Sequence, residues 1–252
     1  MNYLFLRKRS SIVRAPLLVC VLLLLQISIA WAQDEPEEPN FIGKYRESAM
    51  KRWDDDIRKL EELDQQEQHS PQAILFTGSS SIRRWETIAE DMQPWEPIRR
   101  GYGGARFSDL AIFVDRIVSP HEVQAIVIFV GNDISGGEKD KTPQEVLEIY
   151  KYIVGKINFL QPNKPIFCIG VTPTSSRWEA WPKVEEMNRL IQEFSAAQQD
   201  LHFIDTANAY LGPDGKPNDG LFVKDRLHLN AEGYKLWSRI IKKSLKSVLG
   251  PQ

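Results

Sequence analysis

The residues best suited to chemistry lie in a short polar loop, Asp225-Arg226-Leu227-His228-Leu229-Asn230, ahead of the last amphipathic segment. A carboxylate and an imidazole three residues apart are costly to bury unless they pair or take part in a reaction. In a Ser-His-Asp arrangement the carboxylate orients the imidazole and stabilises its charged form. The loop could therefore supply an acid and a base. It could equally be a surface loop in which Asn230 caps the following helix and Glu232 lies in its first turn.

A serine-rich turn is the first of three polar motifs that each follow an apolar, strand-like run. Gly78-Ser79-Ser80-Ser81 ends the run 73–77 and precedes a helix expected to begin near Ile82. A serine here stands at the carboxyl end of a strand, with backbone N–H groups able to meet an oxyanion. The other interpretation is that one of these serines is only a helix N-cap.

The other two motifs could supply oxyanion donors. Gly101-Tyr102-Gly103-Gly104-Ala105 follows a weak run at 97–100, and its glycines permit close approach of a backbone N–H to a substrate. Asn132 follows the run 124–130 and could donate a side-chain hydrogen bond to an oxyanion. A plain turn and an Asx turn are the structural alternatives. The glycine motif is not a phosphate loop, because neither Gly-Lys-Ser/Thr nor a complete G-x-G-x-x-G is present.

Apolar runs and helical patterns alternate along the chain. Runs that are apolar on both faces suit a parallel sheet covered on both sides, and three are found, at 73–77, 124–130 and 165–171. A shorter candidate strand lies at 201–204 and a weak one at 97–100. Helical spacing of apolar residues marks the segments 44–66, 142–157, 184–194 and 237–248. This alternation predicts an α/β fold, a three-layer α/β/α sandwich with a mainly parallel sheet of about five strands. Ligand sites of such sheets lie at the carboxyl ends of the strands, where the polar motifs fall.

The amino-terminal segment has the features of an export signal. Arg7, Lys8, Arg9 and Arg14 precede the apolar stretch 16–29, and Ala30-Trp31-Ala32 offers a cleavage site before Gln33. We expect residues 1–32 to be a signal peptide, 33–43 a flexible acidic tether and 44–252 a single domain that is periplasmic or secreted. An uncleaved anchor is the alternative, although the apolar stretch is short for a membrane span.

Net charge and the numbers of cysteines and histidines limit the kinds of partner and cofactor that the sequence predicts. Removal of residues 1–32 takes away four of the 32 basic residues and none of the 34 acidic ones, which leaves 28 against 34 and a net charge of −6. No Lys/Arg cluster indicates nucleic-acid binding. Cys168 alone remains after processing, so no intramolecular disulfide is expected. The histidines, at 69, 121, 202 and 228, form no pattern of metal ligands, and no cofactor or metal is predicted. The oligomeric state is not indicated.

In their order along the chain, the serine-rich turn, the glycine motif, the Asn132 motif and the Asp225–His228 loop resemble the four motifs of the SGNH hydrolases, also called the GDSL family. The likeness runs from about Ala73 to Tyr234, and the strings ILFTGSSSIRRW, RGYGGA and LFVKDRLHLNAEGY are similar to a bacterial branch of GDSL-type esterases. The resemblance implies Ser80 as nucleophile, Asp225 and His228 as its acid and base, and Gly104 and Asn132 as matches of the second and third motifs.

Three of the motifs depart from the family pattern. Ser79 stands where the aspartate of G-D-S is usual, Val130 where a glycine is expected, and Arg99 and Arg100 where an asparagine is frequent. None of these departures removes a catalytic group.

The function implied by the resemblance is that of a serine hydrolase acting on small-molecule esters through an acyl-enzyme. The Ser80 and Gly104 N–H groups and the Asn132 amide would hold the oxyanion. The substrate could be an acyl ester, a lipid or an acetylated glycan. A carbohydrate O-deacetylase of exported or envelope glycans is one alternative. A non-catalytic envelope protein that binds glycan or lipid through a degenerate pocket is an alternative of another class.

Residues after the fourth run are expected to line the substrate pocket. Thr172, Pro173 and Arg177 follow the run 165–171 near the predicted site. Trp178 and Trp181 come next, and we expect them to pack over the sheet edge rather than to contact a sugar or headgroup.

Overall fold

Five short strands form one parallel sheet in the part of the chain that the structure, a computed structural model, describes: Met1 and residues 35–251. The strands are β1 (Ile74–Gly78), β2 (Pro97–Gly101), β3 (Ala125–Phe129), β4 (Ile166–Ile169) and β5 (Leu201–Ile204), in the spatial order β2-β1-β3-β4-β5. β1, β3 and β4 are buried along their whole length. The predicted α/β sandwich is confirmed. Apart from Met1, the predicted signal peptide lies outside the described residues.

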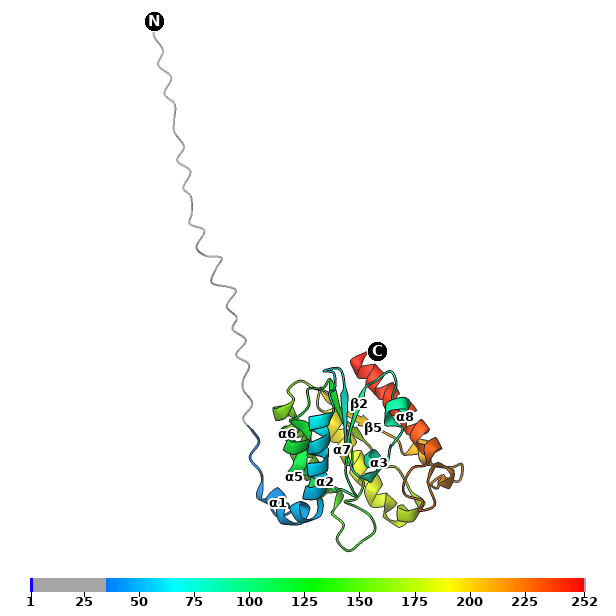
Figure 1. Ribbon diagram of the computed structural model, residues 1–252. Helices are drawn as coiled ribbons and strands as arrows, with labels where there is room; N and C mark the ends of the chain where they lie inside the picture. The colour runs from blue at the N-terminus through cyan, green and yellow to red at the C-terminus, as the bar shows by residue number, and fades with distance from the viewer. Residues whose placement is uncertain (2–34, 252) are drawn as a thin grey trace. The chain divides into compact units, whose positions relative to one another are not determined.

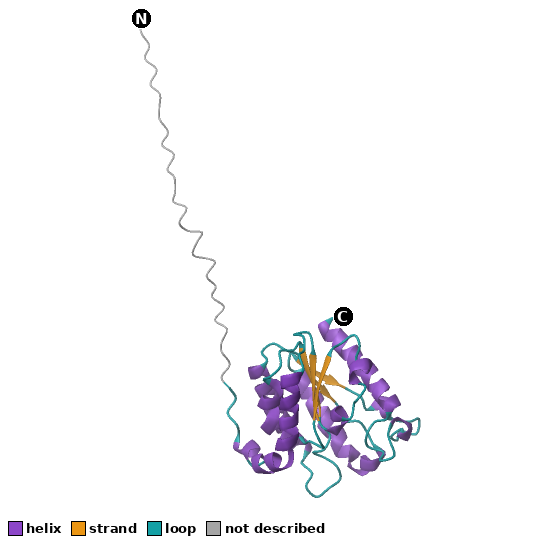
Figure 2. Ribbon diagram, viewed as in Figure 1, coloured by secondary structure: helices purple, strands orange, loops and turns teal. Residues whose placement is uncertain are grey.

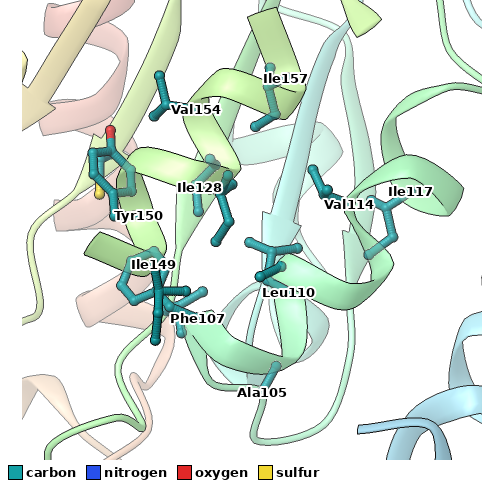
Figure 3. Close-up of a cluster of buried hydrophobic side chains, with 14 of the residues drawn as sticks. Ala105, Phe107, Leu110, Val114, Ile117, Ile128, Ile149, Tyr150, Val154 and Ile157 are labelled. Carbon is teal, nitrogen blue, oxygen red and sulfur yellow. The ribbon is translucent and has the colours of Figure 1, made fainter. Parts of the chain in front are cut away.

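Helices cover both faces of the sheet (Figures 1 and 2). One face packs against α2 (Arg46–Gln66), α5 (Phe107–Val118), α6 (Pro143–Leu160) and α7 (Trp181–Ala196). The other packs against α3 (Ser80–Arg83), α4 (Ile88–Asp91) and α8 (Ala231–Leu249). Because successive strand residues point to opposite faces, Leu75 joins the first apolar cluster while Ile74 and Phe76 join the second. Figure 3 shows side chains of α5 and α6 gathered around Ile128 of β3.

The packed part of the chain begins before residue 44. Residues Asn40–Gly43 form a short helix, α1, inside the segment predicted as an acidic tether. Ile42 is fully buried in the same cluster as α2 and α5, and Lys156 of α6 donates a hydrogen bond to Glu35, 2.5 Å away. The acidic composition of this segment predicted a flexible tether and gave no sign that Ile42 packs into the core. Within the described residues, no helix is both long enough and apolar enough to cross a membrane.

The helix starts follow their capping residues. Thr142 accepts from the Glu145 N–H, and the Glu145 carboxylate accepts from the Thr142 N–H, 2.8 Å away, which completes the predicted capping box of α6. Three short 3₁₀ turns fill the connections on the C-terminal side of the sheet: η1 (Ser175–Ala180), η2 (Asn208–Tyr210) and η3 (Asp219–Leu221). Of these, η1 and η3 carry contacts that matter for the site.

The register of the three strands β2, β1 and β3 places their polar motifs together. Gly78, the last residue of β1, pairs with Gly101 of β2 on one side and with Phe129 of β3 on the other. The segments that leave these strands therefore start at one level of the sheet. Gly78 has φ +126°, and a Cβ there would lie 1.9 Å from the Phe129 carbonyl oxygen. Only glycine fits this close approach, which turns the chain sharply into Ser79 and Ser80.

Candidate active site

His228 lies between Ser80 and Asp225 and is within hydrogen-bond distance of both side chains. Ser80 Oγ is 2.9 Å from His228 Nε2, and His228 Nδ1 is 2.7 Å from Asp225 Oδ2. Ser80 is the first residue of α3, whereas Asp225 and His228 lie between η3 and α8. The structure thus brings together the nucleophile, base and acid indicated by the sequence, from positions 148 residues apart.

Asp225 is held in its ionised form. Its Oδ1 accepts the backbone N–H groups of Leu227 and His228, both at 2.9 Å. Burial would raise the pKa of Asp225, but the backbone N–H and imidazole of His228 and the Leu227 N–H outweigh it and lower that pKa to about 2. Arg84 adds a guanidinium 3.6 Å from Oδ2. Because an ionised carboxylate only accepts, Nδ1 of His228 carries the proton, which leaves Nε2 to accept from Ser80.

The loop that carries the acid and base also caps the last helix. Asn230 Oδ1 accepts the Gly233 N–H at 3.0 Å, and its amide donates to the carbonyls of Gly220 and Phe222. Across the loop, the Val223 N–H donates to the His228 carbonyl at 2.8 Å. The loop therefore caps the helix, as one interpretation of the motif predicted, and it also holds Asp225 and His228 in contact, as the other interpretation requires. Capping fixes the loop in which the pair forms.

The turn that presents Ser80 is fixed mainly by backbone contacts. Ser79 occupies the N-cap position of α3, but its side chain makes no capping bond. Instead its N–H donates to the Phe129 carbonyl at 2.9 Å. From α8, the Tyr234 hydroxyl donates to the Ser81 carbonyl at 2.9 Å. The helix α8, which follows the loop of His228, thus also holds the turn of Ser80.

Three N–H groups of the predicted oxyanion site keep a hydrogen without an acceptor among the described residues; Ser80 and Asn132 line the pocket described below, whereas Gly104 is exposed and is not part of its wall. Among the described residues, the backbone N–H groups of Ser80 and Gly104 donate to no acceptor. Asn132 Nδ2 donates one hydrogen to the Ala105 carbonyl at 3.0 Å, and its second hydrogen is unused. A Cβ at Gly104 would lie 3.9 Å from Asn132 Nδ2, so these two residues are neighbours. Such free donors are what a developing oxyanion requires.

A small pocket of about 40 Å³ opens beside Ser80 and His228. Of the predicted pocket residues, Thr172 and Arg177 line it, whereas Pro173 is buried and is not part of its wall. The sequence did not indicate the apolar walls, which come from several separate elements: Phe129, Ile134, Val171, Trp181, Val184, Phe222, Leu227, Leu229 and Trp237.

The two tryptophans after the fourth strand pack against each other and against the apolar cluster. Trp178 and Trp181 stack with ring centroids 6.1 Å apart and an interplanar angle of 9°. Trp181 belongs to the apolar cluster and Trp178 packs against it. Trp181 also contributes to the pocket wall, a role that its position in the sequence did not reveal.

A parallel α/β sandwich with a Ser-His-Asp arrangement at the carboxyl ends of its strands has the architecture of a serine hydrolase. Residues 66–236 match the model of the GDSL-like Lipase/Acylhydrolase family. The chain belongs to this family and is an ester-hydrolysing enzyme. The resemblance drawn from the four motifs is thereby confirmed.

Solved structures share the fold at low sequence identity. A protein assigned as a platelet activating factor from Streptococcus pneumoniae has a TM-score of 0.68 and 21% identity, with 82% of this chain and 95% of that chain covered. A GDSL-like lipase from Bacteroides thetaiotaomicron has a TM-score of 0.62 and 15% identity, with 76% and 97% covered. A carbohydrate esterase family 3 protein from Talaromyces cellulolyticus has a TM-score of 0.54 and 15% identity, with 71% and 98% covered. No curated protein matches the chain.

Proposed function

We propose that the enzyme hydrolyses esters through an acyl-enzyme on Ser80. His228 Nε2 takes the Ser80 hydroxyl proton as Oγ attacks the ester carbonyl carbon, and Asp225 stabilises the imidazolium. The oxyanion accepts hydrogen bonds from the Ser80 and Gly104 N–H groups and the Asn132 amide. The C–O bond to the alcohol then breaks as His228 returns the proton to the leaving oxygen. Water repeats the sequence and releases the acid.

The observation that carries this proposal is the continuous chain of contacts of 2.9 and 2.7 Å from Ser80 through His228 to Asp225. The same geometry argues against the non-catalytic alternative, because a pocket that only binds does not need an ionised carboxylate that fixes the imidazole tautomer. The Asn132 amide, which lines the same pocket as Ser80 and has one hydrogen left over, supports it independently.

The size of the pocket favours a short acyl group. A volume of about 40 Å³ corresponds to roughly three water positions at about 10–15 Å³ each, which is close to the size of an acetyl group. A palmitoyl chain would have to leave the pocket through its mouth. This observation favours the second candidate function, a carbohydrate O-deacetylase, over a lipase, because acetyl is the acyl group that such an enzyme removes.

The test is hydrolysis of nitrophenyl acetate, butyrate and palmitate by the purified protein and its Ser80→Ala variant. We expect turnover that falls from acetate to palmitate and is lost in Ser80→Ala. Ser247→Ala, on the exposed end of α8, is the matched control. A fluorophosphonate should label the protein but not Ser80→Ala. Equal rates with and without Ser80, together with no labelling of Ser80, would contradict the acyl-enzyme and favour a binding protein.

We also propose that the protein is exported through an amino-terminal signal peptide. The basic residues, apolar stretch and Ala30-Trp31-Ala32 motif support export with cleavage before Gln33. Cell fractionation followed by N-terminal sequencing should recover a periplasmic or secreted protein that starts at Gln33. Recovery of the uncut chain in the membrane fraction would favour the anchor instead.

A further inference from the structure

Arg177 donates hydrogen bonds to the side chain of Asn132 and to the backbone of the residue before it. Its Nη1 donates to the Gly131 carbonyl at 2.6 Å, and its Nη2 donates to Asn132 Oδ1 at 2.9 Å. The side chain is half-buried and lines the pocket. Burial lowers the pKa of Arg177, and the charge of Asp140 partly offsets this. No described carboxylate forms an ion pair with Arg177, so its charge is directed at an amide and a carbonyl.

A guanidinium at this position determines which way the Asn132 amide faces. Arginine has five N–H donors and no acceptor, so the asparagine must present its oxygen to it. The NH₂ group then points to the Ala105 carbonyl, 3.0 Å away, with one hydrogen left over. In the flipped amide, NH₂ would face the guanidinium and Oδ1 would face the Ala105 carbonyl. Both contacts would be repulsive, so Arg177 and Ala105 together select one orientation.

The positive charge also affects the strength of the free donor. A cation beside Oδ1 draws electron density through the amide and makes the Nδ2 hydrogens more positive. The hydrogen that is not bonded to Ala105 is therefore a better partner for negative charge than the amide of an isolated asparagine. Orientation and polarisation both favour charge that develops on a substrate oxygen.

The segment that carries Arg177 is itself attached to the acid and base loop. Arg177 has non-helical backbone angles, φ −128° and ψ 23°, inside η1. One residue earlier, the Ser176 N–H donates to the Arg226 carbonyl at 3.4 Å, and the Ser175 hydroxyl donates to Asp219 at 2.6 Å. One turn of chain thus links the loop of His228 to the amide of Asn132.

We propose that Arg177 is a positioning residue that holds and polarises the Asn132 amide as an oxyanion donor. This role rests on the proposed function and goes beyond the Ser-His-Asp chain and its three donors. Arg177 acts through Asn132 and so should affect the transition state more than substrate binding.

A double-mutant cycle tests the dependence on Asn132. With nitrophenyl acetate, Arg177→Gln should lower kcat by about 10- to 100-fold and change KM little. In the Asn132→Ala background, the same substitution should cost less than about threefold, because the amide it positions is gone. Arg177→Lys should recover part of the loss. Arg189→Gln is the matched control, since Arg189 lies on the exposed face of α7 and pairs with Glu186 and Glu193.

Two kinetic outcomes would overturn the proposal. Losses that multiply in the double variant would show that Arg177 acts independently of Asn132. A raised KM with kcat unchanged would assign Arg177 to substrate binding, for instance to an anionic group of the substrate.

A spectroscopic readout separates this proposal from the hydrolysis reaction. The Asn132 side-chain NH₂ signals in a ¹⁵N–¹H spectrum, identified by their loss in Asn132→Ala, should shift or broaden in Arg177→Gln and remain in place in Arg189→Gln. Unchanged signals in Arg177→Gln would refute positioning even for a protein without ester turnover. Failure of the proposed function would appear elsewhere, as activity that does not depend on Ser80.

Discussion

Replacement of Asp225 by asparagine would change one atom and reverse the proton arrangement of the site. The carboxylate accepts two backbone N–H groups on Oδ1 and the His228 Nδ1–H on Oδ2. Asparagine has only one acceptor oxygen, and that oxygen stays in the Oδ1 position because the backbone N–H groups of Leu227 and His228 donate to it. Its NH₂ group then faces Nδ1, which must become an acceptor, so the imidazole proton moves to Nε2. The histidine can no longer accept the Ser80 proton.

The expected loss is large and lies in turnover. In Ser-His-Asp hydrolases the wrong tautomer costs about 10⁴ in kcat, which corresponds to about 5.4 kcal/mol at 1.36 kcal/mol per tenfold. Nitrophenyl acetate hydrolysis would measure it, with Asp214→Asn as control because Asp214 also accepts a backbone N–H, from Lys216 at 3.1 Å, in an exposed turn. A loss below tenfold in Asp225→Asn would refute the proposed orienting role of the carboxylate.

Other predictions concern the donors and the supports of the site. Asn132→Ala should lower turnover by about 10²–10³, and a loss near twofold in the same assay would remove it from the oxyanion site. Gly78→Ala should lower the free energy of unfolding by at least about 2 kcal/mol in urea denaturation, because φ is +126° and a Cβ would lie 1.9 Å from a carbonyl oxygen; an unchanged midpoint would contradict this. Tyr234→Phe removes the bond to Ser81 and should cost about 1 kcal/mol, read from Tm. Because the pKa of Asp225 falls to about 2 from its ordinary 3.8, its stabilising effect is complete above about pH 4 and is lost as the pH falls towards 2. The Tm of the wild type should therefore drop more steeply over this range than that of Asp225→Asn, and parallel curves would contradict the shift.

The parts of the site that the sequence predicted are those specified by neighbouring residues. Ser80 follows a run that is apolar on both faces and is closed by Gly78, a pattern that favours a buried strand with a polar turn at its end. Asp225 and His228 are three residues apart, so one turn is enough to bring them together. Local spacing therefore made both segments candidates, the resemblance to the GDSL family assigned their roles, and the order of the strands determined that they meet.

Residues whose role depends on distant partners were not predictable in this way. The sequence made 97–100 only a weak strand because of its charges. The structure explains them, since Arg100 of β2 is 2% exposed and pairs with Asp64 of α2 at 2.6 Å and with Glu67, the residue after α2, at 2.8 Å. The contact between Arg177 and Asn132 spans 45 positions and leaves no periodic signal. The apolar walls of the pocket also come from separate elements, so no single stretch could reveal them.

Ser80 and His228 are separated by 148 positions, so the two halves of the site are synthesised at different times. As the chain is synthesised, β1, β3 and their motifs emerge well before the proposed base, and α8 emerges after it. Closing so long a loop is entropically costly until α8 packs against the sheet. Turnover should therefore appear only after the carboxyl-terminal helix has docked, so that activity reports completed folding. A chain cut before Asp225 would keep its nucleophile and its oxyanion donors but have no base to activate them.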